Sequence, residues 1–264
     1  MKKIKLLIIF IVMSTNNIQA QLYDGTPCES EHLIENNRKK IFNNTLESGL
    51  EKLRIETPYS MNSTNYVHFS SSWSSSMRKP DGKAPVKKTS TYYEGIGKYT
   101  SFDPSYIRFS CKYSPFYAID GKIETAWSEG IDGDGENEFI IVPIKNFSNK
   151  IKIFPGFGAN KKLFFQNNRP KNISIYILIS NEKSEAQDSI FFEKFILIDL
   201  FNFELIDNFG FQSIDIPEHI MQKYYSYITK KNNIQDPVFI AIKINSVYKG
   251  SKYSDTLISE IRSE

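Results

Sequence analysis

The residues best suited to chemistry lie in the run from Tyr117 to Trp127, where an Asp-Gly turn precedes a threonine and a tryptophan. Such a turn can present the Asp120 carboxylate, the Thr125 hydroxyl and the Trp127 ring together at one end of a sheet. The segment Asp255–Ile261, near the carboxyl end of the chain, adds further acidic and hydroxyl side chains. If these two segments meet in space, they close one all-β domain and define its site.

A second candidate is the loop-like run that contains Asn168 and Arg169 and is closed by Pro170. The planar guanidinium of an arginine beside a side-chain amide suits the recognition of hydroxyl or carboxylate groups. The alternative is a structural arginine that braces an acidic side chain. The partners considered for it are Glu129, Glu138 and Asp255.

Three aromatic residues also have two interpretations each. The ring of Trp127 stacks on a sugar face, or it packs against the core with its indole N–H bonded to a partner. Tyr248 and Tyr253 flank Gly250 on another candidate loop, where they form an aromatic wall or cover the end of the barrel. The sequence alone leaves these alternatives open.

No catalytic motif is recognisable, since the chain has no Gly-x-Ser-x-Gly elbow, no His-Glu-x-x-His and no P-loop. Asp132, Asp134 and Glu136 alternate as in an EF-hand. That motif fails, because its sixth position is Asn137 in place of Gly and its twelfth is Pro143 in place of Glu. We therefore expect no enzyme activity. A pair of carboxylates that meet in space for glycoside hydrolysis is the catalytic alternative.

The second part of the chain has the pattern of short β-strands separated by turn residues. Several runs alternate apolar and polar residues, which favours antiparallel sheets with one buried face. No helix-period segment of useful length interrupts them, and residues 203–216 are expected to form a hairpin turning at Asn208–Gly210. We predict an all-β fold, an antiparallel β-sandwich of the jelly-roll type, over residues 106–264. The strand-like runs are 139–144, 151–154, 173–177, 195–198 and 238–244.

Residues 21–105 have a different character. Leucines at 46, 50 and 53 have helical spacing, so residues 28–56 are expected to be helical. Residues 59–104 are rich in Ser and Lys and are interpreted as a solvated linker or long irregular loop. The alternative for them is a basic contact with an acidic cell-surface polymer. The prediction is a small helical and irregular N-terminal region before the β domain.

Residues 1–20 have the features of a secretory signal peptide. Three lysines precede the apolar run Leu6–Met13, and Ala20 stands at the expected cleavage point. The apolar run is too short to span a bilayer as a mature helix. We expect a bacterial protein that is secreted or periplasmic, with no membrane span after cleavage. The alternative is an N-terminal membrane anchor.

The overall charge does not point to a charged polymer as partner. The chain has 33 Lys and Arg against 30 Asp and Glu, and residues 1–20 contain three lysines and no acid, so the remainder is balanced. Neither nucleic acid nor anionic lipid is therefore expected as a ligand.

The two cysteines, Cys28 and Cys111, are far apart in the sequence. In an oxidising compartment they can pair and tie the N-terminal segment to the start of the β domain. Two unpaired, buried thiols are the alternative. A zinc site is not expected from two thiols and three scattered histidines.

Ala118, Asp120, Gly121, Thr125 and Trp127 match an Ala-x-Asp-Gly-x-x-x-Thr-x-Trp pattern. With it, the segment from Phe109 to Ile261 resembles the discoidin, or coagulation-factor 5/8 type C, superfamily of galactose-binding-like jelly rolls. Within that superfamily it is similar to the glycan-binding translocation module of secreted NAD glycohydrolases. Further stretches carry the likeness: 127–138, 155–157, 167–171 and 247–261.

The resemblance implies binding and not catalysis, through loops at one end of a sandwich. The expected partner is a glycan or another cell-surface component. The alternative is a protein–protein interaction or envelope-associated structural module without sugar binding. The expected ligand-binding residues are Trp127, Glu129, Asn168, Arg169, Tyr248 and Tyr253.

The resemblance also implies a structural calcium ion held by Asp120, Thr125 and Glu260, with backbone carbonyls completing the shell. No other cofactor is expected. The alternative without metal is that Asp120 accepts a hydrogen bond within its own turn and that Glu260 pairs with a lysine or arginine.

Overall fold

The computed structural model describes residues 22–23, 28, 46–58, 66–67, 71–94, 97–144, 146–185, 189–231 and 237–264. The predicted signal peptide, residues 1–20, lies outside the described residues. So do residues 29–45 of the segment predicted to be helical. None of the described helices is long and apolar enough to cross a membrane.

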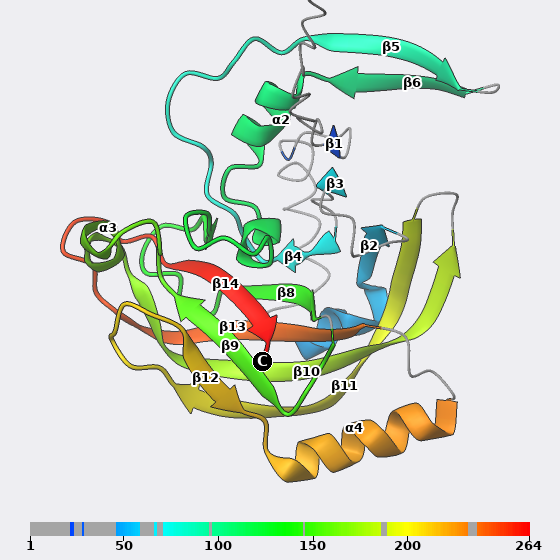
Figure 1. Cartoon of the computed structure of the whole chain (residues 1–264), viewed down its shortest axis with the longest axis vertical. Helices are drawn as coiled ribbons and strands as arrows, with labels where there is room; N and C mark the ends of the chain where they lie inside the picture. The colour runs from blue at the N-terminus through cyan, green and yellow to red at the C-terminus, as the bar shows by residue number, and fades with distance from the viewer. Residues whose placement is uncertain are drawn as a thin grey trace, which may run out of the picture.

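Two antiparallel sheets form a sandwich, which confirms the predicted all-β class (Figure 1). The six-stranded sheet has the order β2-β11-β10-β13-β8-β4 and the four-stranded sheet the order β12-β9-β14-β7. The larger sheet contains β2 (Arg54–Pro58), β4 (Trp73–Ser74), β8 (Phe139–Ile144), β10 (Arg169–Glu185), β11 (Ser189–Glu204) and β13 (Val238–Tyr248). The smaller contains β7 (Trp127–Ser128), β9 (Lys150–Pro155), β12 (Gln212–Asp215) and β14 (Leu257–Ser263).

The two sequence segments expected to close the domain do lie side by side. β14 pairs antiparallel with β7, with Ile258 opposite Trp127 and Leu257 opposite Ser128. On its other side β14 pairs with β9, with Ile261 opposite Ile153. The Asp-Gly turn after η3 (Pro115–Ala118) is thereby held against the C-terminal strand.

The core between the sheets is built mainly from isoleucine. β-branched side chains pack well on a pleated surface and have few rotamers to lose. β8 is buried along its whole length, and therefore reads as an unbroken apolar run instead of an alternating one. Core residues from β8, β10, β13 and β14 are Ile140, Val142, Ile173, Ile175, Ile177, Ile240, Ile242 and Ile258.

The opposite face of the six-stranded sheet is covered by the N-terminal region. There η1 (Glu47–Lys52), β2 and β4 place Leu50, Ile55 and Trp73 in a second core against Phe139 and Ile141. The described part of the segment predicted to be helical is thus a 3-10 helix followed by a strand, and that prediction was wrong for β2. Because β2 and β4 pair within the sheet, the predicted boundary at residue 105 separates parts of one structure.

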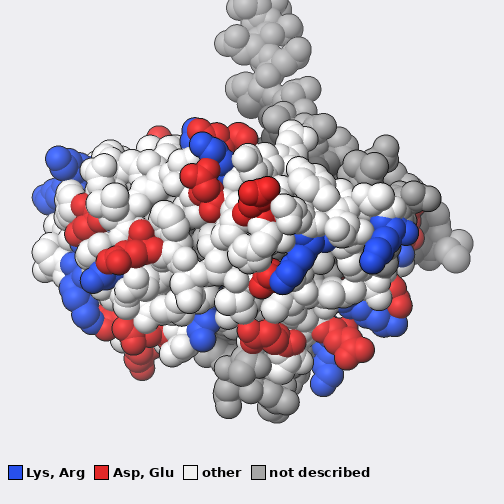
Figure 2. All heavy atoms as spheres, turned by 90° about the horizontal axis from the view of Figure 1, so that it is seen from below, with Lys and Arg blue, Asp and Glu red and all other residues white. Residues whose placement is uncertain are grey.

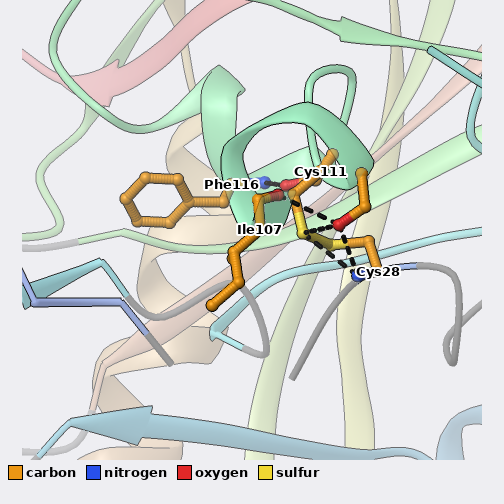
Figure 3. The surroundings of a disulfide bond; sticks show 6 residues. Cys28, Ile107, Cys111 and Phe116 are labelled. Carbon is orange, nitrogen blue, oxygen red and sulfur yellow. Dashed lines mark hydrogen bonds between the residues drawn. A yellow bond between two sulfur atoms is a disulfide. The ribbon is translucent and has the colours of Figure 1, made fainter. Parts of the chain in front are cut away.

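Cys28 and Cys111 form a disulfide, which confirms the predicted pairing (Figure 3). Cys111 follows α2 (Pro104–Ser110), and the bond lies in a small apolar cluster with Ile107. The backbone N–H of Cys28 also donates to the Ser110 hydroxyl, at 3.3 Å. A disulfide that closes a loop of 83 residues typically stabilises a fold by about 2–5 kcal/mol.

Two further sequence expectations fail. β12 pairs with β9 and not with β11, so residues 203–216 are not a hairpin. A helix, α4 (Glu218–Lys231), follows β12, although no useful helical period was recognised. Its Ile220, Met221 and Tyr224, with the partly buried Tyr227 and Ile228, form an apolar face that packs against the main core and stabilises the helix.

The remaining elements lie outside the sandwich. A hairpin of β5 (Thr89–Glu94) and β6 (Gly97–Phe102) stands away from the sheets, while α3 (Lys161–Gln166) covers one end (Figure 1). β1 (Leu22–Tyr23) and β3 (Tyr66–Val67) form a short parallel pair. On the face drawn in Figure 2 acidic and basic side chains are interspersed, as the balanced composition predicts.

Candidate functional site

Three loops meet at the end of the sandwich where β8 and β10 begin and β13 ends. They comprise residues 129–138, 167–168 and 249–256, and the described hydrogen bonds join all three. This is the end at which the sequence placed the ligand-binding residues. The geometry shows which of those side chains face solvent.

Arg169 is a buried structural residue. Its side chain is 5% exposed and forms two parallel bonds with Asp207, Nε–Oδ1 at 3.0 Å and Nη2–Oδ2 at 2.7 Å. Nη1 donates to the carbonyl of Asn167 at 2.6 Å and to that of Lys249 at 3.2 Å. Asp207 is its partner, and not one of the three acids considered from the sequence. Arg169 thus has no free donor face for a ligand.

Asn168 connects the three loops. Its amide nitrogen donates to Asp134 Oδ1 at 2.9 Å and to the Ser254 carbonyl at 2.7 Å, and its amide oxygen accepts from Gly250 N–H at 2.6 Å. The side chain is buried. Lys249 also binds Asp134, and these hydrogen bonds lower the pKa of the Asp134 carboxyl. Asn168 therefore positions the loops and does not face a ligand.

Glu129 is completely buried beneath the first loop. Its Oε1 accepts from Thr256 N–H at 3.1 Å and its Oε2 from Ile131 N–H at 2.9 Å. Burial raises the pKa of this carboxyl to about 7, because the backbone hydrogen bonds only partly replace the lost hydration. Its predicted contact with a ligand does not fit this position.

Trp127 takes the packing role that the sequence left as the alternative. The ring is fully buried, and Nε1–H donates to the Ser76 carbonyl at 3.0 Å. Ser75 Oγ donates to Glu138 Oε2 at 2.6 Å, and Gly130 N–H donates to Ser76 Oγ at 2.9 Å. The segment Ser71–Met77 therefore packs tightly across β7 and β8, and the predicted solvated linker was wrong for it. Residues 79–91 are mostly exposed, and those up to 88 are irregular, as predicted.

Small hydroxyl residues show no hydrophobic periodicity, so the sequence does not predict that the segment Ser71–Met77 is buried. Trp73 in the middle of the run was the one indication that the segment packs, since a large aromatic is seldom left in water. A Cβ at Gly130 would collide with the backbone carbonyl of Met77, so the segment approaches at a distance that only glycine permits.

The two tyrosines differ in exposure. Tyr248 O–H donates to the Leu205 carbonyl at 2.9 Å, so it covers the end of the sandwich. Tyr253 is 37% exposed, and Lys252 Nζ lies 4.8 Å from its ring centroid. Of the six predicted ligand-binding side chains, Tyr253 alone is exposed. Lys252, which the sequence did not single out, lies against its ring, while Lys249 on the same loop pairs with Asp134.

The predicted calcium ligands lie together on the C-terminal strand and the Asp-Gly turn. Asp120 accepts from Lys122 N–H at 3.0 Å and from Thr125 Oγ1 at 2.9 Å, as a capped turn would. Glu260 Oε2 accepts from Gly121 N–H at 3.0 Å. Burial raises the pKa of Glu260 to about 8, and the charge of Asp120 acts in the same direction.

The side-chain oxygens of Asp120, Thr125 and Glu260 are of the kind that binds calcium, but three residues supply too few ligands for a complete coordination shell. Among the described residues Glu260 has no ion pair, and the negative charge of Asp120 raises its pKa while the charge of Arg262 lowers it. Oxygen donors of this kind suit a hard cation. No group of three or more His, Cys, Asp or Glu that could hold a metal occurs among the described residues. Backbone carbonyls would have to supply the other ligands.

Replacing Arg169 by Ala is expected to lower the free energy of unfolding by about 2–4 kcal/mol, because Asp207 and two carbonyls lose their partner. Urea denaturation measures the change. Arg54→Ala is the matched control, since Arg54, like Arg169, pairs with an acidic side chain and lies over a phenylalanine ring but is 55% exposed. It should cost at most about 1 kcal/mol. Equal losses in the two variants would contradict the structural role of Arg169.

Glu129 should make the fold less stable as pH rises. Its pKa is about 7 in the folded chain against 4.5 as ordinary value, so the folded state binds the proton more tightly. The stabilisation is complete below pH 4.5 and is lost as pH rises through 7. Between pH 5.5 and 8 the contribution falls by about 2 kcal/mol.

Urea denaturation at a series of pH values tests this, with Glu129→Gln as comparison. The variant should lose this part of the pH dependence, while Glu260 titrates in both proteins and cancels in the difference. Parallel pH profiles for the two proteins would show that Glu129 is ionised throughout.

The chain matches the family model of the NAD glycohydrolase translocation F5/8 type C domain over residues 93–264. The match begins before the predicted start at residue 106. It includes β6, α2 and every strand from β7 to β14. No curated protein matches the chain.

Solved structures with some likeness are distant. An F5/8 type C domain from Bacteroides fragilis is 13% identical with a TM-score of 0.30, over 57% of this chain and 79% of that one. The mycobacterial arabinofuranosyltransferase AftD gives 10% identity and a TM-score of 0.30, over 57% of this chain and only 9% of AftD. A Ruminococcus gnavus GH29 fucosidase, solved with fucose, gives 13% and 0.25, over 58% and 23%.

These distant likenesses carry no inference about ligand or activity. The family model covers well over half of the chain and includes the Asp-Gly turn, Trp127 and the C-terminal strand that pairs with it. The chain therefore belongs to the NAD glycohydrolase translocation F5/8 type C domain family.

Proposed function

We propose that this chain is a secreted, non-catalytic module that binds a saccharide through the loop end that carries Tyr253. The observation behind the proposal is the exposed Tyr253 ring, presented on a loop whose backbone is held in place. An aromatic ring beside hydrogen-bonding side chains suits a sugar, which has an apolar C–H face and a polar rim.

Backbone N–H groups of the loop that carries Tyr253 bind carbonyl groups at the end of α3. Tyr253 N–H donates to the Gln166 carbonyl at 2.8 Å, Lys252 N–H to the same carbonyl at 3.1 Å, and Ser251 N–H to the Phe165 carbonyl at 3.0 Å. Asn168 fixes Gly250 from below. A loop ordered before binding loses little conformational entropy when a ligand arrives. Asn168 and Arg169 therefore act through the loop, as positioning residues.

Two carboxylates at this end are out of a substrate's reach, although Asp132 and Glu136 on the first loop are exposed. Glu129 has no exposed surface, and Glu138 is buried against the Ser75 hydroxyl. A glycosidase needs one carboxyl group on each side of the scissile bond, reachable by the substrate. Secretion is supported by the Cys28–Cys111 disulfide, since such bonds persist mainly in oxidising compartments.

A glycan array followed by calorimetric titration tests the function. Tyr253→Ala should weaken the selected saccharide about fivefold or more, because the stacking surface is lost. Tyr225→Ala, which removes an exposed tyrosine from α4, is the control and should bind normally. If the folded protein binds no saccharide and instead captures an envelope protein without sugar competition, the protein-docking function replaces this one.

We also propose that Asp120, Thr125 and Glu260 hold a structural calcium ion with backbone carbonyls. When bound, the ion would neutralise two close carboxylates and tie the Asp-Gly turn to β14. Calcium at a hundred times its Kd should raise the unfolding free energy by about 2.7 kcal/mol.

Thermal unfolding with calcium, magnesium and EDTA measures the effect, and Glu260→Gln should abolish it. Glu264→Gln is the control, because Glu264 lies on the same strand end but pairs with Lys152 at 2.8 Å. An unfolding temperature that ignores both calcium and EDTA would leave Asp120 as a turn cap alone.

A further inference from the structure

A hollow of about 570 Å³ lies between the β8–β9 loop and the start of α4. It is at the far end of β8 from the Tyr253 loops, about 20 Å away along a six-residue strand. In Figure 1, α3 and the Tyr253 loops are at the left, and α4 runs below the sheets. Phe147, Asn149, Ile216, Glu218, Met221 and Tyr225 line the hollow.

The aromatic residues that line this hollow are held in place by contacts with a buried tyrosine. Phe147 packs edge-on against Tyr224 with ring centroids 5.0 Å apart, and Tyr224 contacts Tyr225 at 5.3 Å. Ile216 N–H donates to the Asn149 carbonyl at 2.8 Å, which holds the start of α4 against the β8–β9 loop. Tyr224 is buried, whereas Tyr225 is 53% exposed. The hollow is therefore preformed, with one aromatic face open to solvent.

The side chains that line the hollow include a negative charge and no positive one. Glu218 is the one ionisable carboxylate that lines the hollow, and no lysine or arginine lines it. Among the described residues Glu218 has no ion pair, and its Oε1 accepts from Gln222 Nε2 at 3.1 Å. Aromatic faces beside a carboxylate attract a cation through the negative face of each ring and through charge. Met221 adds a polarisable thioether to the same wall.

A neutral saccharide suits this hollow less well. Ser148 and Tyr225 supply the hydroxyl groups of the lining, and that of Ser148 already donates to the Lys150 and Glu264 carbonyls, at 3.0 and 3.1 Å. A sugar has several hydroxyl groups to satisfy, and the hollow is otherwise lined mainly by apolar side chains. An ammonium group flanked by methyl or methylene carbons needs only aromatic contact and one negative charge.

We propose that this hollow binds an organic cation, an alkylated ammonium group that contacts the faces of Tyr225 and Phe147 and is neutralised by Glu218. The inference goes beyond saccharide binding and does not depend on it. The competing explanation is that Glu218 only stabilises the first turn of α4 through the helix dipole. That explanation predicts an effect on stability and none on ligand affinity.

Titration of the full chain with choline chloride, followed by NMR of aromatic resonances, is the test. The neutral isostere 3,3-dimethylbutan-1-ol is the matched ligand control, because it has the same shape without the charge. Choline should bind about fivefold or more tightly than the isostere, and Glu218→Gln should remove most of that difference. Tyr225→Phe should retain binding and Tyr225→Ala should lose about tenfold. Tyr253→Ala should bind choline as the natural chain does.

Phosphatidylcholine vesicles form a second arm, which separates a lipid headgroup from a free cation as the source of the ammonium. Binding to vesicles or to free choline supports the proposal, provided that Tyr225→Ala weakens it. Equal affinity for choline and its isostere, or choline binding that survives Tyr225→Ala in a folded variant, would overturn it. Loss of saccharide binding with retained choline binding would refute the proposed function and leave this one standing.

Discussion

The structure depends on one constraint, which is that the middle strands of the six-stranded sheet have no face that can meet water. β8 is buried throughout, and β13 is buried over its first five residues. The four-stranded sheet can cover only one side. Phe139, Ile141, Phe239 and Ala241 on the other side pack with η1 and with side chains of β2 and β4, the edge strands of the same sheet. Since burying a large apolar side chain contributes roughly 1.5–3 kcal/mol, the N-terminal region is part of the fold.

Much of the sandwich follows from local pattern. The runs that became β8, β9, β10 and β13 are rich in β-branched residues and bounded by turns, and these signals are short-range. The sequence led us to expect the segment Asp255–Ile261 beside the Asp-Gly turn, but it did not predict the register that sets Ile258 opposite Trp127. Long-range partners leave no local trace, and this is why Ser75 and Ser76 read as a linker.

The helix α4 is a different case, because its signal is present in the sequence. Ile220, Met221, Tyr224, Tyr227 and Ile228 recur at helical spacing, and all five pack against the main core. The expectation of an all-β pattern after residue 106 overlooks this short amphipathic segment. Residues 203–216 are not a hairpin for another reason, since Gln212–Asp215 pairs with the distant strand β9.

At the candidate site the sequence selected residues that the fold brings to one end of the sandwich, but it did not predict which of them are buried. Asn168, Arg169 and Glu129 are polar groups that a sequence reading assigns to a surface. Each is buried, and each has hydrogen-bond partners on other loops. Asp207, the partner of Arg169, lies 38 residues away and could not be selected among the other acids. Exposure, which separates Tyr253 from the rest, is a property of the assembled fold.

The disulfide between Cys28 and Cys111 changes the outcome of a proteolytic cut between these two residues. It turns the intervening residues into a closed covalent ring, so a single break between them yields two pieces that cannot diffuse apart. Within that ring, residues 81–91 are exposed at every position but one, and Val86 among them is 73% exposed. A protease that nicks the ring there would leave β2 and β4 seated in the large sheet. The module can therefore be opened at its surface without being taken apart, as long as its surroundings stay oxidising.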